Sequence, residues 1–142
     1  MNASYLIAID GSEPSLKAVD HVIGELTNMA YKPLVYLVNV QSALSSNVTR
    51  FIDLKTVEDF HREEGEAALA NAKEKLTLAG IVFTSHILVG EAAPSLIEFA
   101  QNKGCRMIVM GVRGLGSVTG LFMGSVTTKV VQLSPVPVLL IK

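Results

Sequence analysis

Five short apolar runs recur along this chain, separated by segments that carry helical periodicity or turn residues. The runs cover residues 5–9, 34–40, 81–89, 107–110 and 137–141. Runs that are this short and this continuously apolar are typical of strands buried on both faces of a parallel sheet. Their alternation with helices predicts an α/β fold, in which one open parallel sheet of five strands carries helices on both faces.

Four helices are expected between these strands, each with its own start or stop signal. Ser12 can cap the first helix and Pro14 fits its first turn. Residues 56–78 predict a long Ala- and Glu-rich helix that Gly80 ends, and the polar residues 41–50 before it predict a loop. A third helix follows Gly90 and is ended by Gly104, and Ser125 can cap a short fourth helix.

Helical spacing also predicts which residues of each helix face the core. They are Leu16, Val19, Val22, Ile23 and Leu26 in the first helix, Val57, Phe60, Ala67, Ala68 and Ala72 in the second, Leu96, Ile97 and Ala100 in the third, and Val126, Val130 and Val131 in the fourth.

The length of the chain, 142 residues, suits a single domain spanning residues 1–142. No apolar run approaches the 18 or more residues that a spanning helix needs, so a soluble protein without membrane insertion is expected. The first residues lack the basic start and long apolar core of a signal peptide. Cys105 is the single cysteine, which excludes an internal disulfide and makes the cytoplasm the expected compartment.

Charge is distributed unevenly along the chain. Residues 99–142 contain five Lys and Arg residues and no acid, a formal charge of +5. Because the net charge of the whole chain is −1, residues 1–98 carry a formal charge of −6. An anionic ligand would therefore prefer the C-terminal third. A stretch without acids also fits a dimer surface, so charge alone does not decide between the two.

Residues 111–129 hold five of the eleven glycines, directly after the fourth apolar run. Gly111 and Gly114 leave the carboxyl end of a strand, and Gly124 and Ser125 open a helix whose first amides have no partner within the helix. Such amides bind phosphate, because glycine permits close approach and the helix dipole favours negative charge. Arg113 can add a charged contact. The segment predicts a phosphate site, with a mobile loop of packing glycines as the alternative.

Other phosphate-binding loops do not fit this segment. A Walker-type loop needs a Gly-Lys pair, which the sequence lacks. Gly114, Gly116 and Gly120 resemble a loose dinucleotide fingerprint, but the acidic residue expected about 20 positions later is missing, so hydride transfer is disfavoured.

The sequence gives little support for catalysis. No histidine follows Ser117, as the residue order of an α/β-hydrolase would require. His61 and Glu64 have the spacing of metal ligands on the long helix, but a solvated helix face is the preferred interpretation. The other two histidines are expected on the surface or in a strand, and Cys105 as a buried small hydrophobic residue. We therefore assign no catalytic residue and no metal ligand.

The spacing Gly111-x2-Gly114-x9-Gly124-Ser125 resembles the nucleotide-binding signature of the universal stress protein family. The stretches AIDGS, LVNV and PVPVLLIK resemble the same family along the whole chain. The resemblance implies a Rossmann-like five-stranded sheet in the order 3-2-1-4-5 and a homodimer formed along the last strands. It also implies bound ATP, because members with this signature bind it.

The resemblance further implies which residues form the site. Asp10 matches the acid that contacts the ribose hydroxyls, which its place at the carboxyl end of a strand supports independently. Val40 matches the residue that meets adenine. A first phosphate-and-ribose segment comprises Met110, Gly111, Arg113 and Gly114, and a second comprises Gly124, Ser125, Val126 and Thr127. Asp10 also fits a turn anchor or helix cap, and Val40 also fits a plain strand core.

Two functions remain open on this evidence. The first is an ATP-binding regulatory protein of a stress response, with Mg²⁺ carried by the phosphates. The second is a slow ATPase or a phosphotransferase at the same site, including one that modifies its own Ser or Thr residues. We prefer the first, because no general base or water-positioning residue is evident near the glycine segment. Nucleic-acid binding is disfavoured, because no basic stripe with interleaved aromatic residues is present.

Overall fold

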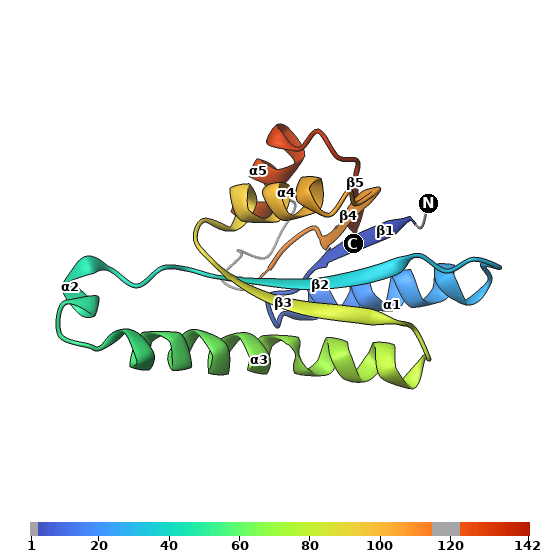
Figure 1. Cartoon of the computed structure of the whole chain (residues 1–142). Coiled ribbons are helices and arrows are strands. Elements are labelled where there is room, and N and C mark those ends of the chain that lie inside the picture. Colours follow the sequence, from blue (N-terminus) through green and yellow to red (C-terminus); the bar gives the residue numbers. More distant parts are fainter. Residues whose placement is uncertain (1–2, 115–122) are drawn as a thin grey trace.

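The computed structural model describes residues 3–114 and 123–142, which form a parallel sheet covered by helices on both faces (Figure 1). The strands are β1 (Ser4–Ala8), β2 (Leu34–Gln41), β3 (Phe83–Val89), β4 (Met107–Gly111) and β5 (Val138–Ile141). Their order across the sheet is β3-β2-β1-β4-β5. This order confirms both the predicted α/β fold and the topology that the family resemblance implies.

The helices are α1 (Glu13–Thr27), α2 (Ser46–Thr49), α3 (Leu54–Leu78), α4 (Ala92–Asn102) and α5 (Ser125–Leu133). Helices α1 and α3 cover one face of the sheet, and α4 and α5 cover the other (Figure 1). The four predicted helices are confirmed. The prediction of a loop over residues 41–50 was wrong in part, because the oxygen of Ser45 accepts a hydrogen bond from the Val48 amide and starts the short helix α2.

Alternate residues of the central strands enter two separate apolar cores. Tyr5 and Ile7 of β1 pack toward α1 and α3, whereas Leu6 packs toward α4 and α5. The predicted inner residues of α1 and α4 are buried or partly buried. Within the described ranges 3–114 and 123–142, no helix is long and apolar enough to cross a membrane.

The buried face of α3 differs from the prediction. Of the five residues predicted to face inward, Ala72 is buried, while Phe60 and Ala67 are exposed. The helix instead buries His61, Gly65, Leu69, Ala72 and Leu76. Gly65 explains the difference, because a Cβ at this position would lie 2.6 Å from the side chain of Ile87 on β3. The absence of a side chain lets α3 pack close to the sheet along this face.

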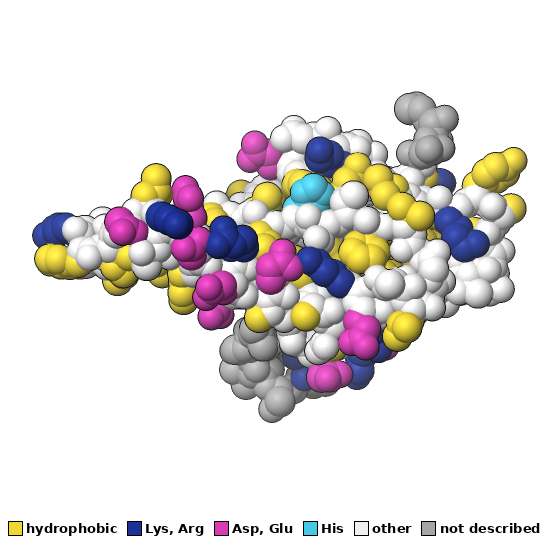
Figure 2. Space-filling model, turned by 60° about the horizontal axis from the view of Figure 1, so that its bottom comes forward, with side chains coloured by type: hydrophobic (Ala, Val, Ile, Leu, Met, Phe, Trp, Pro, Cys, Tyr) yellow, Lys and Arg dark blue, Asp and Glu magenta, His cyan; other side chains and the backbone are white. Residues whose placement is uncertain are grey.

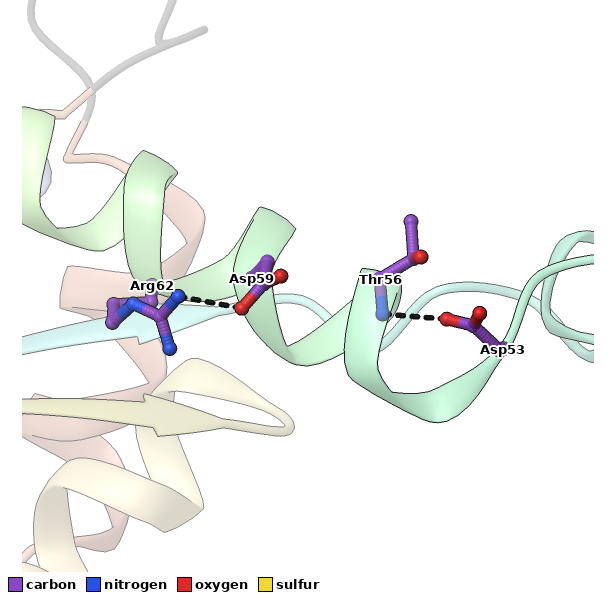
Figure 3. Close-up of polar contacts among 4 residues, drawn as sticks. All are labelled: Asp53, Thr56, Asp59 and Arg62. Atoms are coloured by element: carbon purple, nitrogen blue, oxygen red, sulfur yellow. Dashed lines mark hydrogen bonds and ion pairs between the residues drawn. The ribbon is translucent and has the colours of Figure 1, made fainter.

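The first turns of α3 and the short helix α2 extend beyond the sheet as an arm (Figure 1). Asp53 caps α3 by accepting a hydrogen bond from the Thr56 amide at 2.8 Å, and Asp59 pairs with Arg62 one turn further on (Figure 3). Hydrogen bonding from Thr56, by its side chain first and its amide second, lowers the pKa of the Asp53 carboxyl. Figure 2 shows hydrophobic, acidic and basic side chains mixed over this arm. Phe51, which follows α2, and Leu54, the first residue of α3, are both exposed.

Two predictions about α5 were wrong. Val130 is buried as predicted, but Val126 and Val131 are 38% and 43% exposed, and Thr127 is buried instead. The cap of the helix is Gly124 rather than Ser125, which is the first helical residue. Thr127 faces inward because its Oγ1 donates a hydrogen bond to the carbonyl of Gly111 at 3.1 Å, which joins α5 to the end of β4.

Candidate functional site

A cavity of about 240 Å³ lies at the carboxyl edge of the sheet, where β1 leads to α1 on one face and the chain beyond β4 leads to α5 on the other. The winding of the sheet reverses between these two neighbouring strands, which is where open α/β sheets bind ligands. All ten predicted site residues line the cavity: Asp10, Val40, Met110, Gly111, Arg113, Gly114, Gly124, Ser125, Val126 and Thr127. The structure therefore brings together residues that follow β1, residues at the ends of β2 and β4, and residues at the start of α5.

Asp10 follows β1 and closes a turn into α1. Its Oδ1 accepts hydrogen bonds from the amide and the hydroxyl of Ser12, the first at 2.9 Å. Ser12 is the cap of α1, as predicted, and its Oγ accepts a hydrogen bond from the Ser15 amide. The turn depends on Gly11, which has a φ of +86°. One carboxylate oxygen of Asp10 thus anchors the turn, which is the alternative role that the sequence left open.

The second carboxylate oxygen of Asp10 is directed at Gly114. A Cβ at position 114 would overlap Asp10 Oδ2, and a Cβ at position 111 would lie 2.7 Å from the backbone of Pro14. Real Cβ atoms essentially never approach other atoms this closely. Gly111 and Gly114 are therefore packing glycines: Gly111 lets the end of β4 lie against the first turn of α1, and Gly114 lets the following chain lie against Asp10.

The N-terminus of α5 opens into the same cavity. Its first intrahelical hydrogen bond runs from the Thr128 amide to the Gly124 carbonyl at 3.0 Å, so the amides of residues 125–127 have no acceptor within the helix. Among the described residues, no side chain caps this helix. The N-terminus of α1 differs, because the Asp10 carboxylate and the Ser12 hydroxyl already lie there. Of these two helix ends, α5 is the one that offers its amides and its dipole to an anion.

The model of the Universal stress protein family matches residues 1–142. The chain belongs to this family. It is similar to Universal stress protein YxiE of Bacillus subtilis (strain 168), with 33% identity over 147 residues that cover 96% of this chain and 97% of that protein.

Solved structures of related proteins share the fold of this universal stress protein. The structure of the hypothetical protein MJ0577 of Methanocaldococcus jannaschii gives a TM-score of 0.83 at 27% identity, over 100% of this chain and 96% of that one. A universal stress protein family protein of Arabidopsis thaliana, solved with AMP bound, gives a TM-score of 0.70 at 17% identity, over 99% and 91% of the two chains. At this identity the second likeness shows the shared fold alone.

The cavity of this universal stress protein has an apolar part and a polar part. Val40, Leu96 and Met110 belong to the apolar lining, which β2, α4 and β4 contribute. Asp10 and Arg113 are the charged side chains among its described lining residues. Seven further lining residues were not predicted: Ala8, Ile9, Ser15, Val38, Ser42, Ala92 and Leu96. Those on the strands adjoin predicted residues, whereas those on α4 depend on how the chain crosses the sheet after β3.

The prediction that His61 lies on a solvated face of α3 was wrong, because its side chain is buried and only 6% exposed. Its Nε2 lies 3.2 Å from the carbonyl oxygen of Ser42 and donates to it, because that oxygen can only accept. The packing of Gly65 turns this side of the helix inward, which the helical spacing of apolar residues does not indicate. His61 therefore supports the segment that follows β2, and Ser42 of that segment lines the cavity.

The remaining candidate residues lie away from the cavity lining. Cys105 is buried as predicted, and burial raises the pKa of its thiol. His86 lies beside Phe99, and partial burial, followed by the charge of Lys103, lowers its pKa. Across residues 3–114 and 123–142, no three His, Cys, Asp or Glu side chains are arranged to hold a metal ion. Gly116, Ser117 and Gly120, named above in two motif comparisons, lie outside the described residues.

Proposed function

We propose that this universal stress protein binds ATP in the cavity at the carboxyl edge of the sheet and acts as a nucleotide-responsive regulatory protein of a stress response. The observation that carries the proposal is the pairing of two unlike groups in one cavity. The N-terminus of α5 offers backbone donors that no side chain in the described part of the chain caps, and Asp10 offers a carboxylate that the Ser12 cap of α1 holds in place. A nucleotide has the matching groups, because it carries anionic phosphates and ribose hydroxyls that donate hydrogen bonds.

These two groups also give the proposed orientation of the nucleotide. The phosphates would be bound by the amides of residues 125–127, with Arg113 adding a charge-assisted contact. Asp10 would repel phosphate and accept hydrogen bonds from the ribose. The adenine ring would then pack in the apolar part of the cavity, against Val40 and Met110. The AMP bound to the Arabidopsis family member supports the choice of an adenine nucleotide.

The chemistry of the lining favours holding ATP over hydrolysing it. Hydrolysis requires a group that positions or deprotonates the attacking water. Among the described lining residues Asp10 is the one carboxylate, and its Oδ1 is engaged with Ser12. Mg²⁺ would be held mainly by the phosphate oxygens, because Asp10 is the single carboxylate that the described lining offers it.

We propose further that the protein forms a homodimer in which the two chains pair along β5. This strand is at one edge of the sheet, and all four of its residues, Val138–Ile141, are partly exposed. An edge strand of this kind presents unpaired backbone groups to a second chain. Sedimentation equilibrium tests this proposal, since a monomer at micromolar concentration would contradict it.

Isothermal titration calorimetry of the wild-type protein with ATP tests the nucleotide proposal. We expect saturable binding that Asp10→Ala weakens and that Asp20→Ala does not. Asp20 is a control carboxylate, because it is an exposed residue of α1 that pairs with Lys75 on α3 and does not line the cavity. Incubation with γ-labelled ATP and Mg²⁺ separates the alternative, because multiple turnover that is lost in Asp10→Ala would make the protein an ATPase.

A further inference from the structure

A line of side-chain hydrogen bonds crosses the carboxyl edge of the sheet next to the cavity. Gln41 Nε2 donates to Asn39 Oδ1 at 2.7 Å, and Asn39 Nδ2 donates to the carbonyl oxygen of Ile9 at 2.8 Å. Neither Asn39 nor Gln41 is among the residues that line the cavity. We propose that both are positioning residues that fix the end of β1 and thereby orient Asp10 for the nucleotide. This inference rests on the proposed function and concerns the same site.

The end of β1 needs such support because its pairing with the neighbouring strands stops before Asp10. The paired residues of β1 end at Ala8 on the β2 side and at Ile7 on the β4 side. Ile9 lies beyond both and keeps one backbone bond to β2, from its amide to the Val38 carbonyl at 2.9 Å. Ile9 is 2% exposed, so its own carbonyl requires a partner within the protein. Asn39 supplies this partner.

Asn39 is an unusual residue for its place in the core. Its neighbours on the same face of β2, Val35 and Leu37, belong to the apolar core under α1 and α3. Asn39 is 3% exposed on this face, where an unpaired amide would be costly. Both ends of its amide are paired, and their orientation is unambiguous because the Ile9 carbonyl can only accept. A polar group that is fully paired within an apolar face specifies one local geometry.

The bond to Ile9 acts on Asp10 through the peptide unit. The Ile9 carbonyl and the Asp10 amide lie in one rigid plane, so fixing the carbonyl restricts how Asp10 leaves the sheet. The carboxylate must meet Ser12 with one oxygen and face Gly114 with the other. A small rotation of this plane would therefore move the carboxylate relative to any ribose, at a site where small misplacements weaken function.

The test uses variants that separate positioning from packing. Asn39→Leu keeps the approximate size of the side chain and removes the donor, and we expect it to weaken ATP binding about five- to tenfold. Gln41→Ala alters a partly exposed residue, is expected to fold like the wild type, and should weaken ATP binding about twofold. Leu37→Val is the packing control, because it lowers stability on the same face of β2 and should leave the affinity unchanged.

A second measurement on the nucleotide-free protein does not depend on ATP binding. The Ser12 amide donates to Asp10, and the Thr56 amide donates in the same way to Asp53 at the start of α3. Asn39→Leu should accelerate hydrogen exchange of Ser12 relative to Thr56 at least about threefold, whereas Leu37→Val should leave this ratio unchanged. An unchanged ratio, or wild-type ATP affinity in Asn39→Leu, would overturn the inference. If the wild type binds no ATP, the proposed function fails and the exchange ratio still decides the role of Asn39.

Discussion

The carboxylate of Asp10 and the backbone of Gly114 lie so close together that a Cβ on residue 114 would overlap Asp10 Oδ2. This contact joins the end of β1 to the chain leaving β4, at the point where the winding of the sheet reverses. It also explains physically why a glycine stands at this position of the signature. The side-chain-free residue leaves room for the acid that we propose to bind the ribose.

Gly114→Ala is expected to weaken ATP binding about tenfold or more, because the new methyl group displaces the Asp10 carboxylate. Gly24→Ala is the matched control, since a Cβ there meets nothing within 4 Å and should stabilise α1 by about 0.5–1 kcal/mol. Calorimetric titration of both variants checks the prediction. Equal ATP affinities in the two variants would show that Asp10 does not take part in binding.

Gly124→Val is expected to reduce ATP binding severely while the protein stays folded. The cap residue has φ −63° and ψ 158°, which any residue adopts, so the expected cost in stability is about 1 kcal/mol for a poorer cap. The branched side chain would cover the amides at the start of α5. Circular dichroism verifies the fold and calorimetry gives the affinity. Undiminished ATP binding would exclude these amides as the phosphate site.

ATP is expected to bind more tightly than AMP, because the additional phosphates add negative charge beside α5 and Arg113. For the same reason, ATP affinity should fall more steeply than AMP affinity between about 0.05 and 0.5 M salt. Parallel titrations at several ionic strengths measure both effects. If AMP binds as tightly as ATP with the same salt dependence, the cavity recognises the nucleoside and not the phosphate chain.

Gly65→Ala is expected to lower the free energy of unfolding by about 1–3 kcal/mol, because the new Cβ would lie 2.6 Å from the side chain of Ile87. The affinity for ATP should stay within about twofold of wild type, since neither residue lines the cavity. Urea unfolding measures the first quantity and calorimetry the second. A variant as stable as the wild type would mean that α3 can move away from β3 without cost.

His86→Gln is expected to make the stability less sensitive to acid. Partial burial and the nearby Lys103 lower the pKa of His86, so the unfolded chain binds this proton more readily than the folded protein does. The stability associated with neutral His86 is therefore complete above about pH 6.5 and is lost as the pH falls below that value. Unfolding curves between about pH 7.5 and 5 test this. Parallel decline in the variant and the wild type would contradict it.

The sequence predicted most of the fold, because short apolar runs, helical spacing and a few caps encode it locally. Alternating apolar runs and helical spacing gave the five strands and four of the helices, and Ser12 proved to be the cap of α1. The inner face of α3 was missed because Gly65, a residue without apolar surface, sets how that helix approaches Ile87. Helical periodicity shows where apolar side chains recur. It cannot indicate a close contact that forms because a residue, here Gly65, has no side chain.

The candidate site was predictable where it follows single strands and unpredictable where it depends on crossovers. Asp10 was predicted both from its place after a strand and from the family resemblance, whereas Val40 and Met110 were predicted from the resemblance alone. Their meeting in one cavity follows from the strand order. Ala92 and Leu96 join them because α4 crosses to the face that α5 also covers. The inward turn of Thr127 depends on its bond to Gly111, sixteen residues away, which no local pattern encodes.

A crystal structure of the protein grown with ATP and Mg²⁺ tests the central claim most directly. We predict that the triphosphate lies at the amides of residues 125–127, that the ribose lies within hydrogen-bond distance of Asp10, and that the adenine packs beside Val40. Density for the nucleotide at another place would contradict the assignment of this cavity. So would a cavity without nucleotide density in crystals grown with ATP in large excess over the protein.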